Sequence, residues 1–413
     1  MLPTCSKSLS SLPPYLFVKL NAVKEEAARR GLDLIDLGMG NPDRPTAGHV
    51  VDALCRAARE DPSTHRYPQT KGLKRLRQAI AEWYSTRFGV SLDPEREVLP
   101  LLGSKEGLAH LFFAYLTPAD YALIPSPCYP VHYNGTLLTG AKVHLMPLRE
   151  EESYIPDLAG VPAAIARKAK VLLINYPNNP TGAVVPDLSL FDRCVRFGKK
   201  NRCVVVHDNA YSEIAFDGYR ASSFLQAPGA RKQGVEFHSF SKSYSMAGWR
   251  VAFAVGNAEI LAHLGKFKSF VDYGVPGFIQ EAAAAALSGP QDYVASMTDV
   301  YRQRRDALIR SLSQVGWDVS VPKATLYVWA RLPENLRKLG SFAFAERLIL
   351  KEGVVLAPGI GFGPYGEGYV RFALVEESAR IEEAVRRIGR FLGLQAPSRA
   401  KPRTGRSVLL VEN

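Results

Sequence analysis

Residues 237–256, FHSFSKSYSMAGWRVAFAVG, place a lysine among hydroxyl side chains just before an apolar run. Partial burial or neighbouring cations lower the pKa of an amine, which would free Lys242 to act as a nucleophile or a base. Ser239, Ser241 and Arg250 combine hydroxyl donors with a forked cation, a set that suits a phosphate. A surface Ser-Lys-Ser turn before a buried strand is the plainer alternative.

One cofactor offers an aldehyde for the amine and a phosphate for the arginine: pyridoxal 5′-phosphate. Asp208 follows an apolar run at residues 203–207 and can pair with the protonated pyridine nitrogen, which keeps the ring an electron sink. Tyr211 and Asn179 can form hydrogen bonds to the 3′ oxygen of the ring. For Asp208, the alternative is a helix N-cap without a ligand.

Four further features suit a ligand, each with a structural alternative. Residues 103–107, GSKEG, lie between a strand-like run and a helix, where free amides can hold an anion, although an ordinary turn looks the same. Tyr129 can stack on a ring or be a core tyrosine. Arg371 interrupts an apolar run and suits either a carboxylate ligand or a structural ion pair. Gly40 can admit a ligand close to the backbone or form a tight turn.

The composition indicates a large protein with a substantial core. The chain has 413 residues, of which 46% are hydrophobic and 22% charged, a length that suits two domains. Five cysteines without paired spacing indicate reduced thiols and neither a disulfide framework nor a zinc site. No apolar run is long enough to cross a bilayer, and we find no signal-peptide pattern. We therefore expect a cytoplasmic protein without a membrane partner.

The net charge of +12 suggests acidic partners. Part of the excess lies in residues 395–413, where Pro, Arg and Ser predict a disordered basic tail. The basic residues do not alternate with aromatic residues in one stripe, so nucleic-acid binding is a minor hypothesis. Anionic small-molecule ligands explain part of the charge.

Alternating strands and helices must position these side chains. From residue 46 onward the pattern repeats strand, loop and helix over about 200 residues, which predicts a doubly wound, largely parallel sheet. Ligands of such sheets bind beyond the carboxyl ends of the strands, which is where the polar clusters fall. The expected division is an N-terminal segment (1–45) that joins the small domain, a large cofactor-binding domain (46–285), a small α+β domain (286–394) and the tail (395–413).

Three motifs together resemble a known family. NPTG at 179–182, DNAY at 208–211 and SFSK at 239–242, followed by Arg250, are similar to the signature set of class I aminotransferases, which are pyridoxal-phosphate enzymes of fold type I. Order and spacing match from residue 38 to about 392. The resemblance implies a large domain with a mostly parallel seven-stranded sheet between helices, and a smaller α+β domain.

At a finer level, three segments resemble bacterial glutamate–pyruvate (alanine) aminotransferases. They are GSKEGLAH at 103–110, SKSY with MAGWR at 241–250, and PGIGFG at 358–363. The LL-diaminopimelate aminotransferases share much of this pattern.

The resemblance also implies a role for each matching residue. Lys242 would link covalently to the cofactor aldehyde and move the proton, Asp208 would pair with the pyridine nitrogen, and Arg371 would bind the substrate α-carboxylate. The other cofactor contacts would come from Asn179 and Tyr211 at the 3′ oxygen, from Tyr129 on the ring, and from Ser104, Lys105, Ser239, Ser241 and Arg250 at the phosphate. Tyr67 resembles a tyrosine that reaches the phosphate of the neighbouring subunit, which implies a homodimer with shared sites.

On the substrate side, Gly40 and Asn179 would line the site, with Tyr15 and Tyr273 as further candidates. Residues 270–277 contain no arginine, although aspartate aminotransferases place their side-chain carboxylate ligand there, which argues against strict aspartate specificity. We expect transamination between a small L-amino acid and a 2-oxo acid, with alanine and glutamate leading, and pyruvate and 2-oxoglutarate as the oxo acids. The alternatives are an LL-diaminopimelate aminotransferase, a carbon–sulfur lyase on the same scaffold, and a non-enzymatic regulator.

Overall fold

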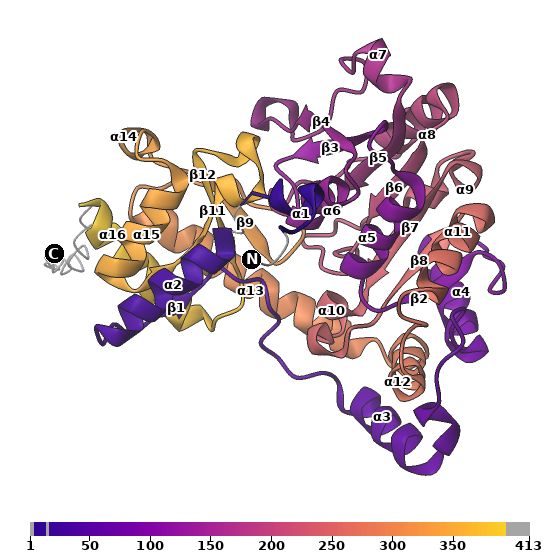
Figure 1. The fold of residues 1–413 in the computed structure, drawn as a ribbon. Coiled ribbons are helices and arrows are strands. Elements are labelled where there is room, and N and C mark those ends of the chain that lie inside the picture. Colours follow the sequence, from indigo (N-terminus) through magenta and orange to yellow (C-terminus); the bar gives the residue numbers. More distant parts are fainter. Residues whose placement is uncertain (1–3, 14–15, 394–413) are drawn as a thin grey trace, which may run out of the picture.

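The computed structural model describes residues 4–13 and 16–393, arranged as a larger and a smaller group of helices and strands (Figure 1). Tyr15 and the predicted basic tail at 395–413 lie outside the described residues. Within the described residues, no helix combines the length and apolar character that a membrane crossing needs.

The larger group is built on a seven-stranded sheet of order β2-β8-β7-β6-β5-β3-β4. Its strands are β2 (Val98–Leu101), β3 (Tyr121–Ser126), β4 (Lys142–Pro147), β5 (Ala169–Asn175), β6 (Val204–Asp208), β7 (Gly234–Ser239) and β8 (Ala252–Gly256). Strand β8 runs in the direction opposite to the other six strands, since it pairs antiparallel with both β2 and β7. The mostly parallel, seven-stranded sheet expected from the sequence is therefore confirmed.

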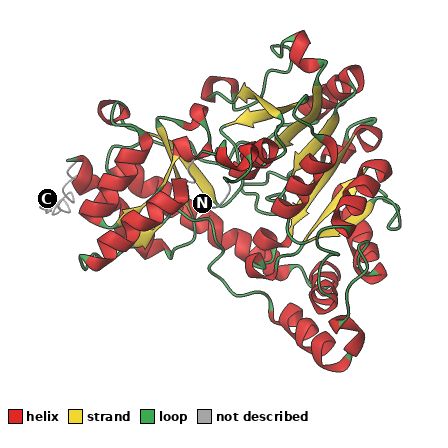
Figure 2. Cartoon of the chain, in the orientation of Figure 1, coloured by secondary structure: helices red, strands yellow, loops and turns green. Residues whose placement is uncertain are grey.

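Helices cover both faces of this sheet, so its central strands are apolar almost throughout (Figure 2). The helices of this group are α3 (Gly48–Glu60), α4 (Lys74–Phe88), α5 (Ser104–Tyr115), α6 (Pro130–Leu138), α7 (Ala163–Ala166), α8 (Ser189–Asn201), α9 (Ala230–Gln233), α10 (Phe240–Ser243), α11 (Ala258–Ser269) and α12 (Gly277–Ser288). One apolar cluster joins the sheet to α5, α6 and α11, and a second joins it to α4, α8 and α12.

The smaller group contains most of the C-terminal third of the chain. Its elements are α13 (Asp292–Gln314), β9 (Tyr327–Arg331), α14 (Glu334–Arg337), α15 (Ser341–Glu352), β10 (Val354–Val355), β11 (Ala357–Pro358), β12 (Tyr369–Ala373) and α16 (Ser378–Leu392). Strands β11, β12 and β9 form an antiparallel sheet in that order. A separate apolar cluster lies between this sheet, α13, α15 and α16. A smaller α+β domain, as expected, completes the fold.

The N-terminal segment is divided between the two groups. Helix α2 (Leu16–Arg29) packs on α15, and β1 (Ile35–Asp36) pairs in parallel with β10, which places both beside the smaller group. The short α1 (Lys7–Ser10) lies near α6 of the larger group instead. The domain boundaries at 45/46 and 285/286 remain predictions.

Candidate active site

A cavity of about 290 Å³ lies beyond the carboxyl ends of β5, β6 and β7. Residues from both groups of elements line it, including Arg371 of β12 and Tyr327 of β9. The predicted site residues that line it are Gly40, Ser104, Lys105, Tyr129, Asn179, Asp208, Tyr211, Ser239, Ser241, Lys242, Arg250 and Arg371. The ends of the parallel strands β5, β6 and β7 meet at one edge of the sheet, which brings Asn179, Asp208 and Lys242 together. Gly40 and Arg371, more than 300 positions apart in the sequence, close the cavity from the side of the smaller group.

Lys242 lies on α10, directly after β7. The Ser239 side chain caps this short helix by accepting a hydrogen bond from the Ser241 amide at 3.2 Å. The amine of Lys242 donates a hydrogen bond to the carbonyl oxygen of Gly40. Burial lowers the pKa of Lys242; the phenol of Tyr327 opposes this shift, while nearby arginine cations add to it. The amine is therefore easier to deprotonate than that of an ordinary exposed lysine.

Asp208 ends β6 and is 4% exposed. Its Oδ2 lies 2.9 Å from Nε2 of His132, which must be the donor because a carboxylate only accepts. Its Oδ1 is buried and has no hydrogen-bond partner among the described residues. A buried charged oxygen without a partner is costly, so this atom suits a ligand that carries a proton on nitrogen.

The opposite end of the cavity suits an anion. Gly103 precedes α5 with φ of 91°, and a Cβ there would lie 2.5 Å from Nη2 of Arg250, so only glycine lets the guanidinium approach this turn. Arg250 is itself held by a hydrogen bond from Nη1 to the Ala247 carbonyl at 2.8 Å. Together with the first amides of α5 at Ser104 and Lys105, this arrangement favours a phosphate.

Between these ends, an amide and two phenols form a chain of hydrogen bonds. Asn179 Nδ2 donates to Tyr211 Oη at 3.3 Å, and Tyr211 Oη lies 3.2 Å from Tyr327 Oη. Burial would raise the pKa of Tyr327, but the cations of Arg371 and Lys242 lower it below the ordinary tyrosine value. Burial and the Tyr327 phenol raise the pKa of Tyr211 well above that value.

Arg371 is a buried cation, 4% exposed, in the middle of β12. Its guanidinium lies over the Tyr327 ring at 3.9 Å and near the Phe362 ring at 4.6 Å. Nη2 donates to the Gly38 carbonyl at 2.9 Å, and Nε has no partner among the described residues. Within the described part of the chain, no carboxylate lies within ion-pair distance of it. The structural ion pair is thus absent there, and a ligand carboxylate is the better fit.

Two residues that sequence reasoning missed belong to this site. His132 lies on α6 and reaches Asp208, and Tyr327 lies on β9 and lines the cavity between Gly40 and Tyr211. No local spacing marks either residue, because each reaches the site only through tertiary packing. For Tyr327, the only signal in the sequence is that a tyrosine begins an apolar strand.

Two predicted residues lie elsewhere. The rings of Tyr67 and Tyr273 contact each other with centroids 5.5 Å apart, and these residues are 88% and 54% exposed. Neither lines the cavity. Tyr67 as a phosphate contact of a neighbouring subunit and Tyr273 as a substrate neighbour remain predictions, as does Tyr15.

The residues present fit pyridoxal 5′-phosphate. The unpaired Oδ1 of Asp208 suits the ring nitrogen, and the amide and phenol of Asn179 and Tyr211 suit the 3′ oxygen. The turn at Gly103 with Arg250 suits the phosphate, and Lys242 suits the aldehyde. Each functional group of the cofactor thus has a chemically matched partner on the cavity wall.

Comparisons with known proteins support this assignment. The family model for aminotransferase class I and II matches residues 33–388. LL-diaminopimelate aminotransferases from Moorella thermoacetica and Dehalococcoides mccartyi are each 48% identical to this chain, and both alignments cover 94% of this chain and 98% of the relative. The substrate-bound structure of BacF from Bacillus subtilis superimposes with a TM-score of 0.91 at 37% identity, covering 97% of this chain and 100% of that one.

These relatives contradict one expectation from the sequence. Alanine and glutamate as the leading pair are wrong, because the similar curated proteins are LL-diaminopimelate aminotransferases. The segments behind that expectation, such as residues 103–110 and 241–250, surround the cofactor cavity. They report the type of reaction and carry little information about the substrate side chain.

Proposed function

The chain belongs to the class I and II aminotransferase family, and on that premise we propose that it transfers an amino group from LL-diaminopimelate to a 2-oxo acid. The observation that carries the proposal is the 48% identity to LL-diaminopimelate aminotransferases over almost the whole chain. The protein is an aminotransferase, so the carbon–sulfur lyase and the non-enzymatic regulator are no longer favoured. The family implies dependence on pyridoxal 5′-phosphate.

The buried arginine supports binding of an amino acid by its α-carboxylate. Arg371 offers a fork of donors, of which Nε is free of partners in the described residues. A guanidinium fork holds a carboxylate by two hydrogen bonds and fixes its orientation. The contacts of Arg371 with Asn179 and Gly38 hold the fork in place before the substrate binds.

When bound, pyridoxal 5′-phosphate supplies an aldehyde that links to an amine and a ring that takes up the electrons left by the departing α-proton. Asp208 Oδ1 would hold the proton on the ring nitrogen. Lys242 Nζ would take the proton from the substrate Cα, since burial lowers the pKa of its amine and favours the neutral base. The hydrogen bond from Lys242 to Gly40 would keep that amine on the substrate side.

A pair of amino donors tests the proposed substrate. The holoenzyme is mixed in single turnovers with LL-diaminopimelate or with L-alanine, without an oxo acid, and the absorbance of the lysine-bound cofactor is followed. L-alanine is the matched control, because it has the same α-amino and α-carboxylate groups but lacks the distal end. We expect LL-diaminopimelate to discharge that absorbance at least about 100-fold faster at equal concentration, a difference of about 2.7 kcal/mol.

Equal rates for the two donors would refute the substrate proposal while leaving the aminotransferase assignment intact. A third arm with cystathionine checks the remaining chemistry, because a lyase would release pyruvate and ammonia without consuming an oxo acid. The expected result for this arm is no pyruvate.

A further inference from the structure

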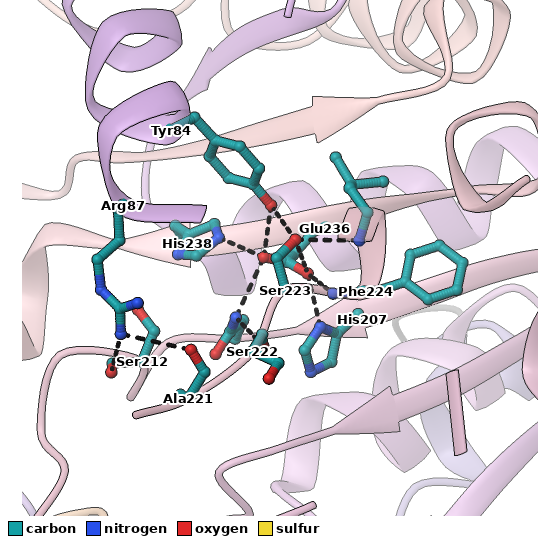
Figure 3. A network of polar contacts seen from close by, with 12 residues as sticks. Tyr84, Arg87, His207, Ser212, Ala221, Ser222, Ser223, Phe224, Glu236 and His238 are labelled. Atoms are coloured by element: carbon teal, nitrogen blue, oxygen red, sulfur yellow. Dashed lines mark hydrogen bonds and ion pairs between the residues drawn. The ribbon is translucent and has the colours of Figure 1, made fainter. Parts of the chain in front are cut away.

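Glu236 of β7 is fully buried and accepts six hydrogen bonds (Figure 3). Its Oε1 receives Tyr84 Oη at 2.6 Å, His238 Nε2 at 2.6 Å and Asn209 Nδ2 at 3.1 Å. Its Oε2 receives His207 Nδ1 at 2.8 Å, the Phe224 amide at 2.6 Å and Ser223 Oγ at 3.1 Å. Every lone pair of this carboxylate has a donor, which is the condition for keeping a buried charge.

Charge balance supports an ionised Glu236. Burial alone would raise its pKa, but the contacts with His207 and His238 hold it well below the ordinary value. His207 has acceptors on both sides, since Nδ1 faces Glu236 and Nε2 lies 2.9 Å from the Tyr176 carbonyl. Both ring nitrogens of His207 thus face an acceptor, so its imidazole is held on both sides between β7 and the end of β5.

The position of this pair connects it to the cavity. His207 and Asn209 are the two neighbours of Asp208, and both donate to Glu236. Since side chains alternate along a strand, Glu236 and its strand partner His207 lie on one face of the sheet while Asp208 lies on the other. Glu236 thus holds the backbone on both sides of Asp208 from the face opposite the cavity.

The same network extends to the neighbouring strand β5. His207 Nε2 reaches the carbonyl of Tyr176, at the start of the loop that carries Asn179. Asn175 Nδ2 donates to the Asp208 carbonyl at 2.7 Å, and its Oδ1 accepts the Asn179 amide at 3.0 Å. A shift of His207 would therefore move the ends of both β5 and β6.

We propose that Glu236 is a positioning residue that fixes the Asp208 carboxylate for the ring nitrogen of the cofactor. It acts through His207 and Asn209 and does not touch the cavity. The proposal rests on the proposed role of Asp208 and is independent of which amino acid is the substrate.

Cofactor binding to the apoprotein tests this role without any catalytic assay. Apoprotein is titrated with pyridoxal 5′-phosphate and with its 1-deaza analogue, in which CH replaces the ring nitrogen, and binding is followed by quenching of tryptophan fluorescence. The wild type is expected to prefer the nitrogen-containing cofactor. In Glu236→Gln, we expect the affinity for pyridoxal 5′-phosphate to fall about tenfold or more, as for a lost charge-assisted hydrogen bond, and the affinity for the analogue to change less than about threefold.

Tyr84→Phe is the matched control, because it removes one donor to Glu236 and leaves the charge and both neighbours of Asp208 in place. We expect it to lower the melting temperature without changing the ratio of the two affinities. If Glu236→Gln does not yield folded protein, Asn209→Ala is titrated in the same way, with the same expected loss of preference.

Two results would overturn the proposal. An equal fall in both affinities would show a general collapse of the cavity, and an unchanged preference in the variants would show that Glu236 does not act through Asp208. If the wild type binds both compounds equally, the proposed contact of Asp208 with the ring nitrogen is refuted. The positioning role of Glu236 is then refuted as well.

Discussion

Asn179 joins two parts of the cavity through opposite ends of one amide. Its Oδ1 accepts a hydrogen bond from Arg371 Nη1 at 2.8 Å, while its Nδ2 donates to Tyr211 Oη at 3.3 Å. Arginine only donates, so the amide has one possible orientation here. The proposed carboxylate site and the proposed 3′-oxygen site are therefore linked by one rigid contact.

The guanidinium of Arg371 is expected to be essential for substrate binding. Arg371→Lys keeps the charge but loses the fork and the stacking on Tyr327, so kcat/KM for LL-diaminopimelate should fall about 100- to 1,000-fold, or about 3–4 kcal/mol. Steady-state kinetics with the holoenzyme measures this loss. The matched control is Arg331→Lys, an exposed arginine on the adjacent strand β9, which should retain kcat/KM within about twofold. Equal activity of wild type and Arg371→Lys would rule out the carboxylate role.

Gly40 is expected to tolerate no side chain. A Cβ at this position would overlap the Tyr327 hydroxyl and lie 2.6 Å from its Cζ, and Tyr327 is only 3% exposed and cannot move aside. Gly40→Ala should therefore destabilise the protein by about 1–3 kcal/mol and lower kcat/KM at least about tenfold. Urea unfolding and kinetics measure the two effects.

The control for this substitution is Gly48→Ala, where a Cβ meets nothing within 4 Å. Its stability should stay within about 0.5 kcal/mol of the wild type. Similar effects at both glycines would mean that the loss at Gly40 is not steric.

Part of this site could be predicted from the sequence because its signals are local. Asp208 and Lys242 each follow an apolar strand, and a parallel sheet brings such strand ends together. Arg371 was recognisable because a cation breaks an otherwise apolar strand. These local departures from a simple burial pattern mark the site.

The rest depends on contacts that no short segment encodes. His132 is one of several polar residues on α6, and its hydrogen bond to Asp208 depends on how α6 packs beside β6. Glu236 is one charged residue within the buried strand β7, and its six donors come from separate parts of the larger group. The substrate was mispredicted because the recognisable motifs surround the cofactor cavity.

An exposed aromatic cluster is expected to form the contact between two subunits. The rings of Tyr67 and Tyr273 contact each other, and these residues are 88% and 54% exposed. Phe270, three positions before Tyr273, is 84% exposed, so these three residues present apolar surface that a partner could cover. We expect light scattering to give twice the 45.4 kDa mass of the chain. Phe270→Asp should raise the dimer dissociation constant at least about tenfold, since a charge would be buried at the contact.

The matched control is Val321→Asp, which changes another exposed apolar residue (54% exposed). It should leave the mass unchanged. A wild-type mass equal to that of one chain would refute the predicted dimer. It would also refute the proposed contact of Tyr67 with the cofactor phosphate of a neighbouring subunit.

The protonation of Lys242 is expected to respond in opposite directions to two of its neighbours. Burial lowers its pKa from the ordinary value of 10.5, the Tyr327 phenol raises it, and the Arg371 cation lowers it. A lowered pKa means that the neutral, reactive amine appears at lower pH. In the apoprotein, labelling of Lys242 with trinitrobenzenesulfonate, read by peptide mass spectrometry, should therefore reach half its maximal rate below pH 10.5.

Two variants test the causes separately. Tyr327→Phe removes the group that favours the ammonium ion, so the labelling midpoint should move to lower pH. Arg371→Met removes a repelling cation, so the midpoint should move to higher pH. Shifts in the same direction for both variants would show that altered burial, and not charge, controls the amine. Opposite shifts would show that the cavity tunes Lys242 as a base through the same two side chains that flank the proposed carboxylate site.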